Sequence, residues 1–280
     1  MLQEFYRTDQ ARVDISSIDQ IDVHSQTHGI ALKMVIEGHE QYQVGTFNGK
    51  VQKGQMLLLD EKTPFIAHIH ESRPQIGMCV DLPKSWVQSI SEPVLEIHDS
   101  KQWEIPAAVY TLEAYPFYQQ MRHFHRNLSL FNWQGEGHEY LFELATHFHE
   151  FLLTIRGERA KIPAVKRSTK WAIHQRLHVA LSYVHDQMRN PFSLSDIAAV
   201  SMLSEYHLCR LFRKVYGKTL FQYHEHLKLE ASKRLLQSGH YSVVEVSDEL
   251  GFTDQSYFAK RFRKATGTSP GKYARSYRTA

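Results

Sequence analysis

The sequence predicts an α+β protein of two domains, a β-rich N-terminal domain with trailing helices and an all-helical C-terminal domain. Three observations predict this division. Turn residues recur between residues 20 and 82, helix-compatible residues prevail after residue 105, and charge reverses sign along the chain. A chain of 280 residues has the length of about two domains. We place these at 1–156 and 169–280, joined by a basic linker at 157–168.

Strand patterns fill the N-terminal domain. Residues 30–36 form an apolar run, and Tyr42, Val44 and Thr46 alternate with polar neighbours, as in a half-buried strand. Asn48-Gly49 is predicted as a two-residue hairpin turn, because both residue types tolerate positive φ. Short strands separated by turns at this spacing predict a small antiparallel barrel or sandwich.

A long helix with a wide apolar face is predicted over 139–153. Its apolar positions are Leu141, Leu144, Phe148, Phe151 and Leu152. Such a face packs either on its own domain or on a second copy of the chain. A homodimer through 139–153 is therefore one of two expectations.

The net charge of +3 is unevenly distributed. Residues 1–160 carry 13 Lys and Arg against 21 Asp and Glu, whereas residues 161–280 carry 20 against 9. A basic half of net charge +11 favours nucleic acid as a partner. Attraction between the acidic and the basic half is the alternative.

A duplicated pattern occupies the basic half. The Phe-Arg-Lys sequence at 212–214 recurs 50 positions later at 262–264. We predict helix–turn–helix units at 194–216 and 243–266, joined by a connector helix at 219–238. That helix is about 30 Å long at 1.5 Å per residue, close to the roughly 34 Å of one turn of DNA. The two units therefore fit successive turns on one face of a duplex.

The second helix of each unit is predicted to enter the major groove, where its N-terminal residues contact base edges. Its buried positions are Leu208, Leu211, Phe212 and Val215 in the first unit, and Phe258, Phe262 and Ala265 in the second. Ser204 and Thr253 are predicted to cap these helices and to contact phosphates. The exposed faces carry Glu205, Tyr206, His207, Arg210 and Lys214 in the first unit, and Gln255, Ser256, Lys260, Arg261 and Lys264 in the second.

From Trp171 to Tyr277 the chain resembles the AraC/XylS family of bacterial transcription regulators, most closely over residues 250–273. The resemblance implies double-stranded DNA and RNA polymerase as partners, an activator role, and a homodimer in the bacterial cytoplasm, associated with the nucleoid when bound. It also implies which residues face bases: Tyr206, Cys209 and Arg210 in the first unit, and Ser256, Tyr257 and Lys260 in the second. Lys228, Ser232 and Ser247 depart from the family pattern at packing positions, which is expected to loosen the coupling between the units.

The N-terminal half resembles the cupin-like sensor domain of the same family, which implies a cupin-like β-barrel that holds a small-molecule effector. Residues 1–160 contain 11 of the 18 histidines. The predicted effector-binding residues are His24, His28, Lys33, Tyr42, His68 and His70. Two alternatives stay open: control by a protein partner, and a metal-dependent cupin enzyme with a DNA-targeting tail.

No catalytic constellation is present in the sequence, so we assign no catalytic residue and no cofactor. The order of the histidines does not match the usual cupin metal pattern, and we assign no metal site. No apolar run reaches the ~20 residues that span a bilayer, and no secretory signal precedes residue 20. With only two cysteines, Cys79 and Cys209, a reduced cytoplasmic protein is expected.

Overall fold

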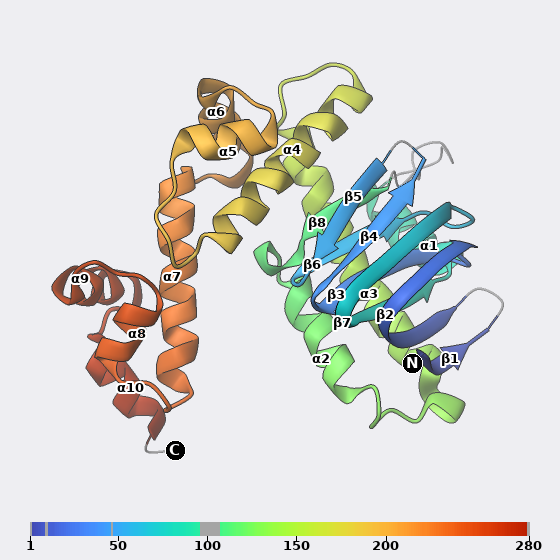
Figure 1. Ribbon diagram of the computed structural model, residues 1–280, viewed down its shortest axis with the longest axis horizontal. Coiled ribbons are helices and arrows are strands. Elements are labelled where there is room, and N and C mark those ends of the chain that lie inside the picture. The colour runs from blue at the N-terminus through green and yellow to red at the C-terminus, as the bar shows by residue number, and fades with distance from the viewer. Residues whose placement is uncertain (1, 9–10, 46, 96–106, 279–280) are drawn as a thin grey trace. The chain divides into compact units, whose positions relative to one another are not determined.

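The computed structural model describes residues 2–8, 11–45, 47–95 and 107–278 of the chain (Figure 1). The chain divides into two compact units, Met1–Gly157 and Glu158–Ala280. The first unit holds the strands and the second is entirely helical in its described residues.

The first unit is built on one antiparallel sheet. Two strands are unusually long, at 15 residues for β2 and 19 for β7. The paired order is β1-β2-β7-β3-β6-β8, with β4 pairing β5 and β7 beside this path. The strands are β1 (Leu2–Arg7), β2 (Arg12–Gln26), β3 (Ile30–Glu37), β4 (His39–Val44), β5 (Phe47–Gln52), β6 (Gln55–Leu59), β7 (Pro64–Leu82) and β8 (Ala108–Thr111).

Strand β7 divides the sheet into two branches. Its first half pairs with β4 and its second half with β3, while β2 pairs along both halves. The branches share one apolar core, which includes Val35 and Leu57 from one branch and Tyr42 and Val51 from the other. Among the described residues no ladder joins the edge strands, so the closed barrel predicted from the sequence is not confirmed. The sheet folds over its own core but remains open.

The hairpin between β4 and β5 turns earlier than predicted. Val44 pairs with Phe47, and Tyr42 pairs with Gly49, so Asn48 and Gly49 lie inside β5. Gly45 supplies the positive φ that the turn requires, at +56°. The prediction of a turn at Asn48-Gly49 was therefore wrong, because an adjacent glycine places the turn three residues upstream.

Helix α3 (Trp133–Ala160) covers the predicted range 139–153 and extends beyond it at both ends. Phe151 contacts the rings of Tyr110, Tyr115 and Phe117 at centroid distances of 5.1–5.3 Å. The apolar positions Leu141, Leu144, Phe148 and Phe151 are buried. This face packs within its own unit and is not available to a second copy of the chain.

Other helical segments of the first unit are α1 (Lys84–Leu95), η2 (Leu112–Ala114) and α2 (Phe117–Asn127). The second unit contains α4 (Arg167–Asp186), α5 (Leu194–Ser201), α6 (Glu205–Tyr216), α7 (Leu220–Gln237), α8 (Val243–Glu249), α9 (Gln255–Thr266) and α10 (Pro270–Arg278). Because α3 ends at Ala160 and α4 begins at Arg167, residues 161–166 separate them, fewer than the predicted linker at 157–168.

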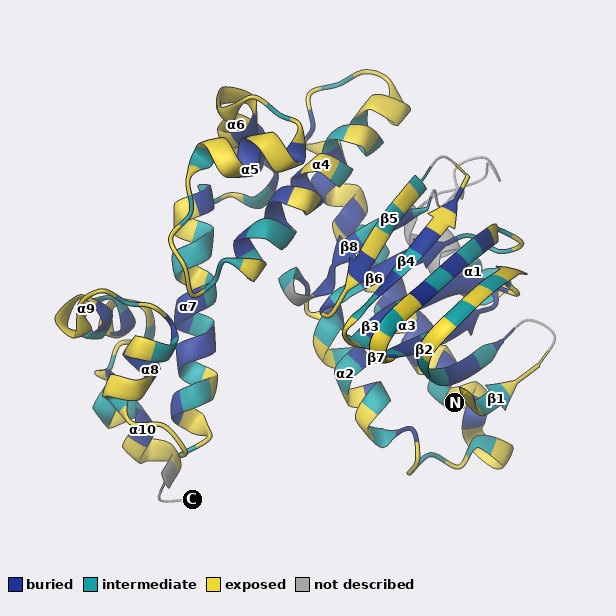
Figure 2. Cartoon of the chain, in the orientation of Figure 1, coloured by how far each residue is buried: buried dark blue, intermediate teal, exposed yellow. Residues whose placement is uncertain are grey.

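Helix α7 is the central element of the second unit. Figure 1 shows α5 and α6 near one end of α7, and α8, α9 and α10 beside the other. Its middle carries Lys228, Leu229, Ala231 and Ser232, all buried, which Figure 2 shows as a dark band. Two helical groups therefore pack on a single 18-residue helix. No described helix combines the length and the apolar character needed to cross a membrane.

Candidate nucleic-acid interface

The first helix–turn–helix consists of α5 and α6. Ser193 caps α5 by accepting a hydrogen bond from the backbone N–H of Asp196. Met202 ends the helix in a left-handed conformation with φ of +51°, which bends the chain into the turn. The side chain of Ser204 then accepts the N–H of His207 and caps α6. The predicted cap at Ser204 is confirmed.

Helix α6 has one buried and one exposed face. Leu208, Leu211, Phe212 and Val215 are buried, as their spacing predicted. The other predicted positions are exposed: Ser204, Glu205, Tyr206, His207, Cys209, Arg210 and Lys214. Tyr206 is 70% exposed, so a large aromatic ring projects from the first turn of the helix.

An open depression of about 560 Å³ adjoins α6. Its lining consists of Cys209, Arg210, Arg213, Lys214 and Thr219. Three cationic side chains around one depression give a surface suited to phosphate groups. Arg213 was not among the predicted residues, although its place beside Lys214 in the repeated Phe-Arg-Lys sequence is a signal that points to it.

The second helix–turn–helix consists of α8 and α9. Ser242 and Glu245 form a reciprocal capping box at the start of α8. Gly251 has a φ of +62° in the turn, as predicted. Asp254, not Thr253, caps α9, because its carboxylate accepts the N–H groups of both Ser256 and Tyr257. The predicted cap at Thr253 was wrong by one residue.

Helix α9 repeats the two-faced pattern with one difference. Phe258 and Phe262 are buried, whereas Ala265, predicted as buried, is exposed. The exposed predicted positions are Thr253, Gln255, Ser256, Tyr257, Lys260 and Lys264. Buried contacts of α9 therefore end one turn earlier than those of α6.

Arg261 is held within the protein. Its Nε and Nη2 groups both donate to the carboxylate of Glu225 on α7. The hydroxyl of Tyr257 donates to the same carboxylate at 3.1 Å. The hydrogen bonds that Arg261 donates to Glu225 raise the pKa of Arg261 above its ordinary value. Arg261, predicted to face DNA, therefore orients α9 on the connector, and Glu225 is a residue that sequence reasoning missed.

The turn of the second helix–turn–helix packs against the residues that follow α4. A Cβ on Gly251 would lie 2.0 Å from the carbonyl oxygen of Arg189, which follows α4. Arg189 also forms an ion pair with Glu249 at the end of α8. Lys228 on α7 donates to the carbonyl of Gly251 at 3.1 Å and lies 5.3 Å from the Phe252 ring centroid. These contacts join the two helical groups.

Two of the three residues that depart from the family pattern have hydrogen-bond partners, whereas the buried hydroxyl of Ser247 has none among the described residues. Lys228 takes part in the junction just described, and the hydroxyl of Ser232 donates to the carbonyl of Leu229 at 2.7 Å. Burial lowers the pKa of Lys228. The ammonium group of Lys228 bonds directly to the second turn, which argues against looser coupling at this position.

A polar cluster lies on the inner face of the sheet in the first unit. The pairing register places Asp14, Cys79 and Lys33 side by side on β2, β7 and β3. Lys33 Nζ lies 3.3 Å from Cys79 Sγ and 4.2 Å from the Phe65 ring centroid. The Tyr42 hydroxyl donates to Glu40 at 2.5 Å. Two predicted effector residues, Lys33 and Tyr42, therefore share one buried region.

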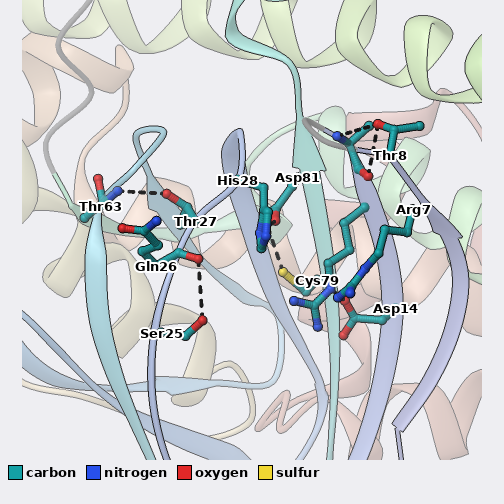
Figure 3. A network of polar contacts seen from close by, with 12 residues as sticks. Arg7, Thr8, Asp14, Ser25, Gln26, Thr27, His28, Thr63, Cys79 and Asp81 are labelled. Atoms are coloured by element: carbon teal, nitrogen blue, oxygen red, sulfur yellow. Dashed lines mark hydrogen bonds and ion pairs between the residues drawn. The ribbon is translucent and has the colours of Figure 1, made fainter.

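Buried acidic groups lie beside half-buried cationic ones in this cluster. Asp14, Glu40 and Asp81 are at most 5% exposed. Arg12 pairs with Asp14 at 2.5 Å, and His28 Nδ1 lies 3.6 Å from Asp81. Figure 3 shows His28, in the turn between β2 and β3, beside Asp81 and Cys79 of β7, with Asp14 near them.

Burial governs the protonation of the cluster. It raises the pKa of Asp14 and of Glu40, and it raises the pKa of Cys79 to about 12. Burial also opposes the charged form of Lys33, but Cys79, Asp81 and Asp14 outweigh it and raise the pKa of Lys33. The cluster thus favours the charged form of a half-buried lysine.

The remaining predicted effector residues lie on the opposite face. His24, His68 and His70 share a face with Asp22, by strand alternation and register. Asp22 Oδ1 lies 2.5 Å from His68 Nδ1 and 3.0 Å from His70 Nε2, and these hydrogen bonds lower the pKa of Asp22. The six predicted residues therefore form two separate groups.

Comparisons with known proteins agree with this geometry. A family model described as a helix-turn-helix domain matches residues 197–276. The arabinose operon regulatory protein of Escherichia coli is 31% identical over 141 residues, covering 50% of this chain and 46% of that protein. The transcriptional activator AarP of Providencia stuartii is 33% identical over 93 residues, covering 33% of this chain and 69% of AarP.

Other matches are partial or distant. The matched segments span about a third to a half of the first curated relatives. A crystal structure of ToxT from Vibrio cholerae O395 aligns with 95% of this chain and 98% of its own, at 12% identity and a TM-score of 0.39. These curated relatives are named as an operon regulatory protein and a transcriptional activator. The chain belongs to the AraC/XylS family of DNA-binding transcription regulators.

Proposed function

We propose that this chain activates transcription by placing α6 and α9 in two adjacent major-groove segments of DNA. The observation that carries this proposal is the matched exposure of both helices, each capped at its N-terminus and each with a polar outer face. Major-groove contacts come from the N-terminal residues of such helices. Arginine suits guanine, and glutamine suits adenine, so Arg210 and Gln255 are the strongest candidates for base contacts.

The connector sets the spacing of the two contacts. Helix α7 has 18 residues and is about 27 Å long at 1.5 Å per residue. With the width of the helices packed at its ends, this length suits major-groove segments about 34 Å apart. The Glu225–Arg261 pair and the Lys228–Gly251 hydrogen bond hold α9 and its turn on the connector, which favours binding as one body.

Electrostatics supports the same partner. The basic half of the chain carries a net charge of +11 over residues 161–280. Binding of full-length protein to DNA should therefore weaken steeply as salt concentration rises, because each phosphate contact releases counterions. Fluorescence anisotropy with a labelled duplex measures this slope. A flat response between 50 and 200 mM salt would contradict phosphate contacts from this surface.

We further propose that the inner cluster of the sheet controls the regulator by binding a small polar effector. Asp14, Lys33, Glu40 and Asp81 are ionisable groups inside an otherwise apolar core. Burying a charged group costs free energy, so buried charges are often kept for a function other than stability. A ligand with hydroxyl or charged groups would find both donors and acceptors there.

Thermal shift against sugars, amino acids and organic acids tests the effector proposal. A binding compound should raise the melting temperature of the native chain and fail to raise that of Lys33→Met. The double variant His68→Gln/His70→Gln is the matched control, because both histidines lie on the opposite face of the sheet. No shift across a broad panel would favour a protein partner on the acidic half.

Activation of transcription would also require protein partners. Activation implies contact with RNA polymerase in the bacterial cytoplasm. A homodimer through α3 would have to use its exposed side, where Phe142 is 43% exposed, because Leu144 and Phe148 are buried. Phe142→Glu should then lower the apparent mass in analytical ultracentrifugation, while Thr146→Glu on the same side serves as a comparison.

A further inference from the structure

Three buried side chains with metal-binding atoms meet at the start of the second unit. Glu158 lies in the last turns of α3, and His174 and His178 lie one turn apart on α4. Each offers one ligand atom, and these atoms all lie within 4.8 Å of one another. The three residues are between 0 and 8% exposed. Neither the DNA contacts nor the proposed effector cluster uses them.

The spacing on α4 is the one that presents two imidazoles to a single ion. Residues four apart lie on the same face of a helix. The two rings are 4.7 Å apart between centroids and inclined by 69°. His174 Nε2 lies 2.8 Å from Glu158 Oε2. A carboxylate from a second helix thus completes a set of two nitrogen ligands and one oxygen ligand.

We propose that Glu158, His174 and His178 bind a divalent transition-metal ion of the zinc class. Two histidines and one glutamate form a common three-residue ligand set for zinc, in which the fourth position is left to water. The absence of a thiolate and the small number of oxygen ligands disfavour copper(I), calcium and magnesium.

Small movements are sufficient to admit the ion. Ligand atoms bound to zinc at 2.0–2.1 Å in a tetrahedral arrangement are about 3.3 Å apart. The Glu158–His174 contact of 2.8 Å would open by about half an ångström on that basis. Both side chains would then bond to the ion in place of this hydrogen bond.

Burial prepares the second histidine for this role. Burial, together with the adjacent His174, lowers the pKa of His178 well below its ordinary value. His178 is therefore neutral at neutral pH, and a neutral imidazole is the form that binds metal. A protonated His178 would repel a cation, and the local environment disfavours that form.

The ion would fasten α3 to α4 close to the first recognition helix. Arg159, next to Glu158, lies 4.0 Å from the Trp171 ring centroid on α4. Lys161 donates to the carbonyl of Val215 in the last turn of α6 at 2.9 Å. A metal bridge at Glu158 would stiffen the same short segment that contacts α6.

Metal binding by the full-length chain tests the proposal directly. Protein stripped with a chelator is incubated with Zn²⁺, desalted, and measured for bound metal by mass spectrometry, with Co²⁺ absorption as a second readout. We expect about one ion per chain and the visible spectrum of a four-coordinate N/O site for Co²⁺.

Two variants assign the site and one controls for the other histidine cluster. His178→Leu should abolish binding, and Glu158→Gln should weaken it by about tenfold or more while keeping a hydrogen-bonding group beside His174. Retained DNA binding shows that each variant is folded. His68→Gln/His70→Gln removes the exposed cluster with Asp22 and should leave binding unchanged.

Either of two results would overturn the proposal. Zinc absent from the desalted native chain would show that the three side chains form only a hydrogen-bonded contact. Binding that disappears in His68→Gln/His70→Gln but persists in Glu158→Gln would assign the ion to the exposed face of the sheet. If His178→Leu does not fold, the Glu158→Gln result alone decides between the two sites.

Discussion

Replacing Gly251 by alanine should separate the two helix–turn–helix units from each other. Gly251 lies in the turn between α8 and α9 with a φ of +62°, and a Cβ there would approach the Arg189 carbonyl oxygen to 2.0 Å. Alanine is disfavoured at this φ, and the contact with a backbone atom cannot be relieved by a side-chain rotation. The turn must therefore move away from Arg189.

The magnitude follows from three contributions. A residue with a side chain in the left-handed region costs about 1–2 kcal/mol, and alanine recovers about 0.4–1 kcal/mol by restricting the unfolded chain. Displacing a packed backbone segment adds about 1–3 kcal/mol. Gly251→Ala should therefore cost about 1–5 kcal/mol in free energy of unfolding. For a domain of this size, that lowers the melting temperature by roughly 4–20 °C.

Gly239→Ala is the matched control. Gly239 has a similar φ of +74°, but no atom lies within 4 Å of the position that its Cβ would take. Only the backbone contribution applies there, about 1 kcal/mol or roughly 4 °C. Differential scanning calorimetry of the full chain measures both variants. Equal losses at the two positions would refute the claim that the second turn is packed against the first helical group.

Four further outcomes follow from individual contacts. Arg261→Ala and Glu225→Ala should each cost about 0.5–1 kcal/mol of stability, and their effects should not add in the double variant, as a denaturation series will show. Arg210→Ala should cost about 1–3 kcal/mol of DNA affinity and relax preference in one half-site only, measured on a library of binding sites; an equal loss on all sequences would make it a phosphate contact. Lys228→Met should lower the free energy of unfolding by about 1–2 kcal/mol, with Lys228→Arg recovering part of it in the same urea titration. The pKa of Glu40 is raised from 4.5 in the folded chain. Its contribution to stability is therefore full below pH 4.5 and is lost as pH rises through the raised pKa, by up to about 1.4 kcal/mol per pH unit. Glu40→Gln should flatten this decline in the free energy of unfolding, while Glu143→Gln should not.

Features of the second unit that depend on nearby residues were predictable from the sequence. The apolar stripe of α6 and the cap at Ser204 follow from spacing within one helix. The left-handed turn at Gly251 follows from the residue type. The duplicated pattern predicted the positions of both helix–turn–helix motifs, because each copy carries the same local signals. Thr253 and Asp254 are both good caps, and the sequence does not distinguish them, since the choice depends on where the chain turns.

Features that depend on distant residues were missed. Glu225 and Arg261 are 36 positions apart, and neither residue alone indicates that the two are paired. The sequence predicted only part of the inner cluster of the sheet, because two of the predicted effector residues, His68 and His70, lie on the outer face. Which face of a strand points inward depends on the whole sheet, and the branching at β7 is not visible in the pattern of any single strand.

The central claim is that α6 and α9 contact DNA together, at a spacing fixed by α7. In vitro selection of binding sites with the full-length chain, repeated with Arg210→Ala and Lys260→Ala, tests it most directly. We expect a site with two half-sites whose centres are about 10 base pairs apart, with each substitution relaxing a different half. A site with a single half, or substitutions that relax the same half, would contradict simultaneous contact by the two helices.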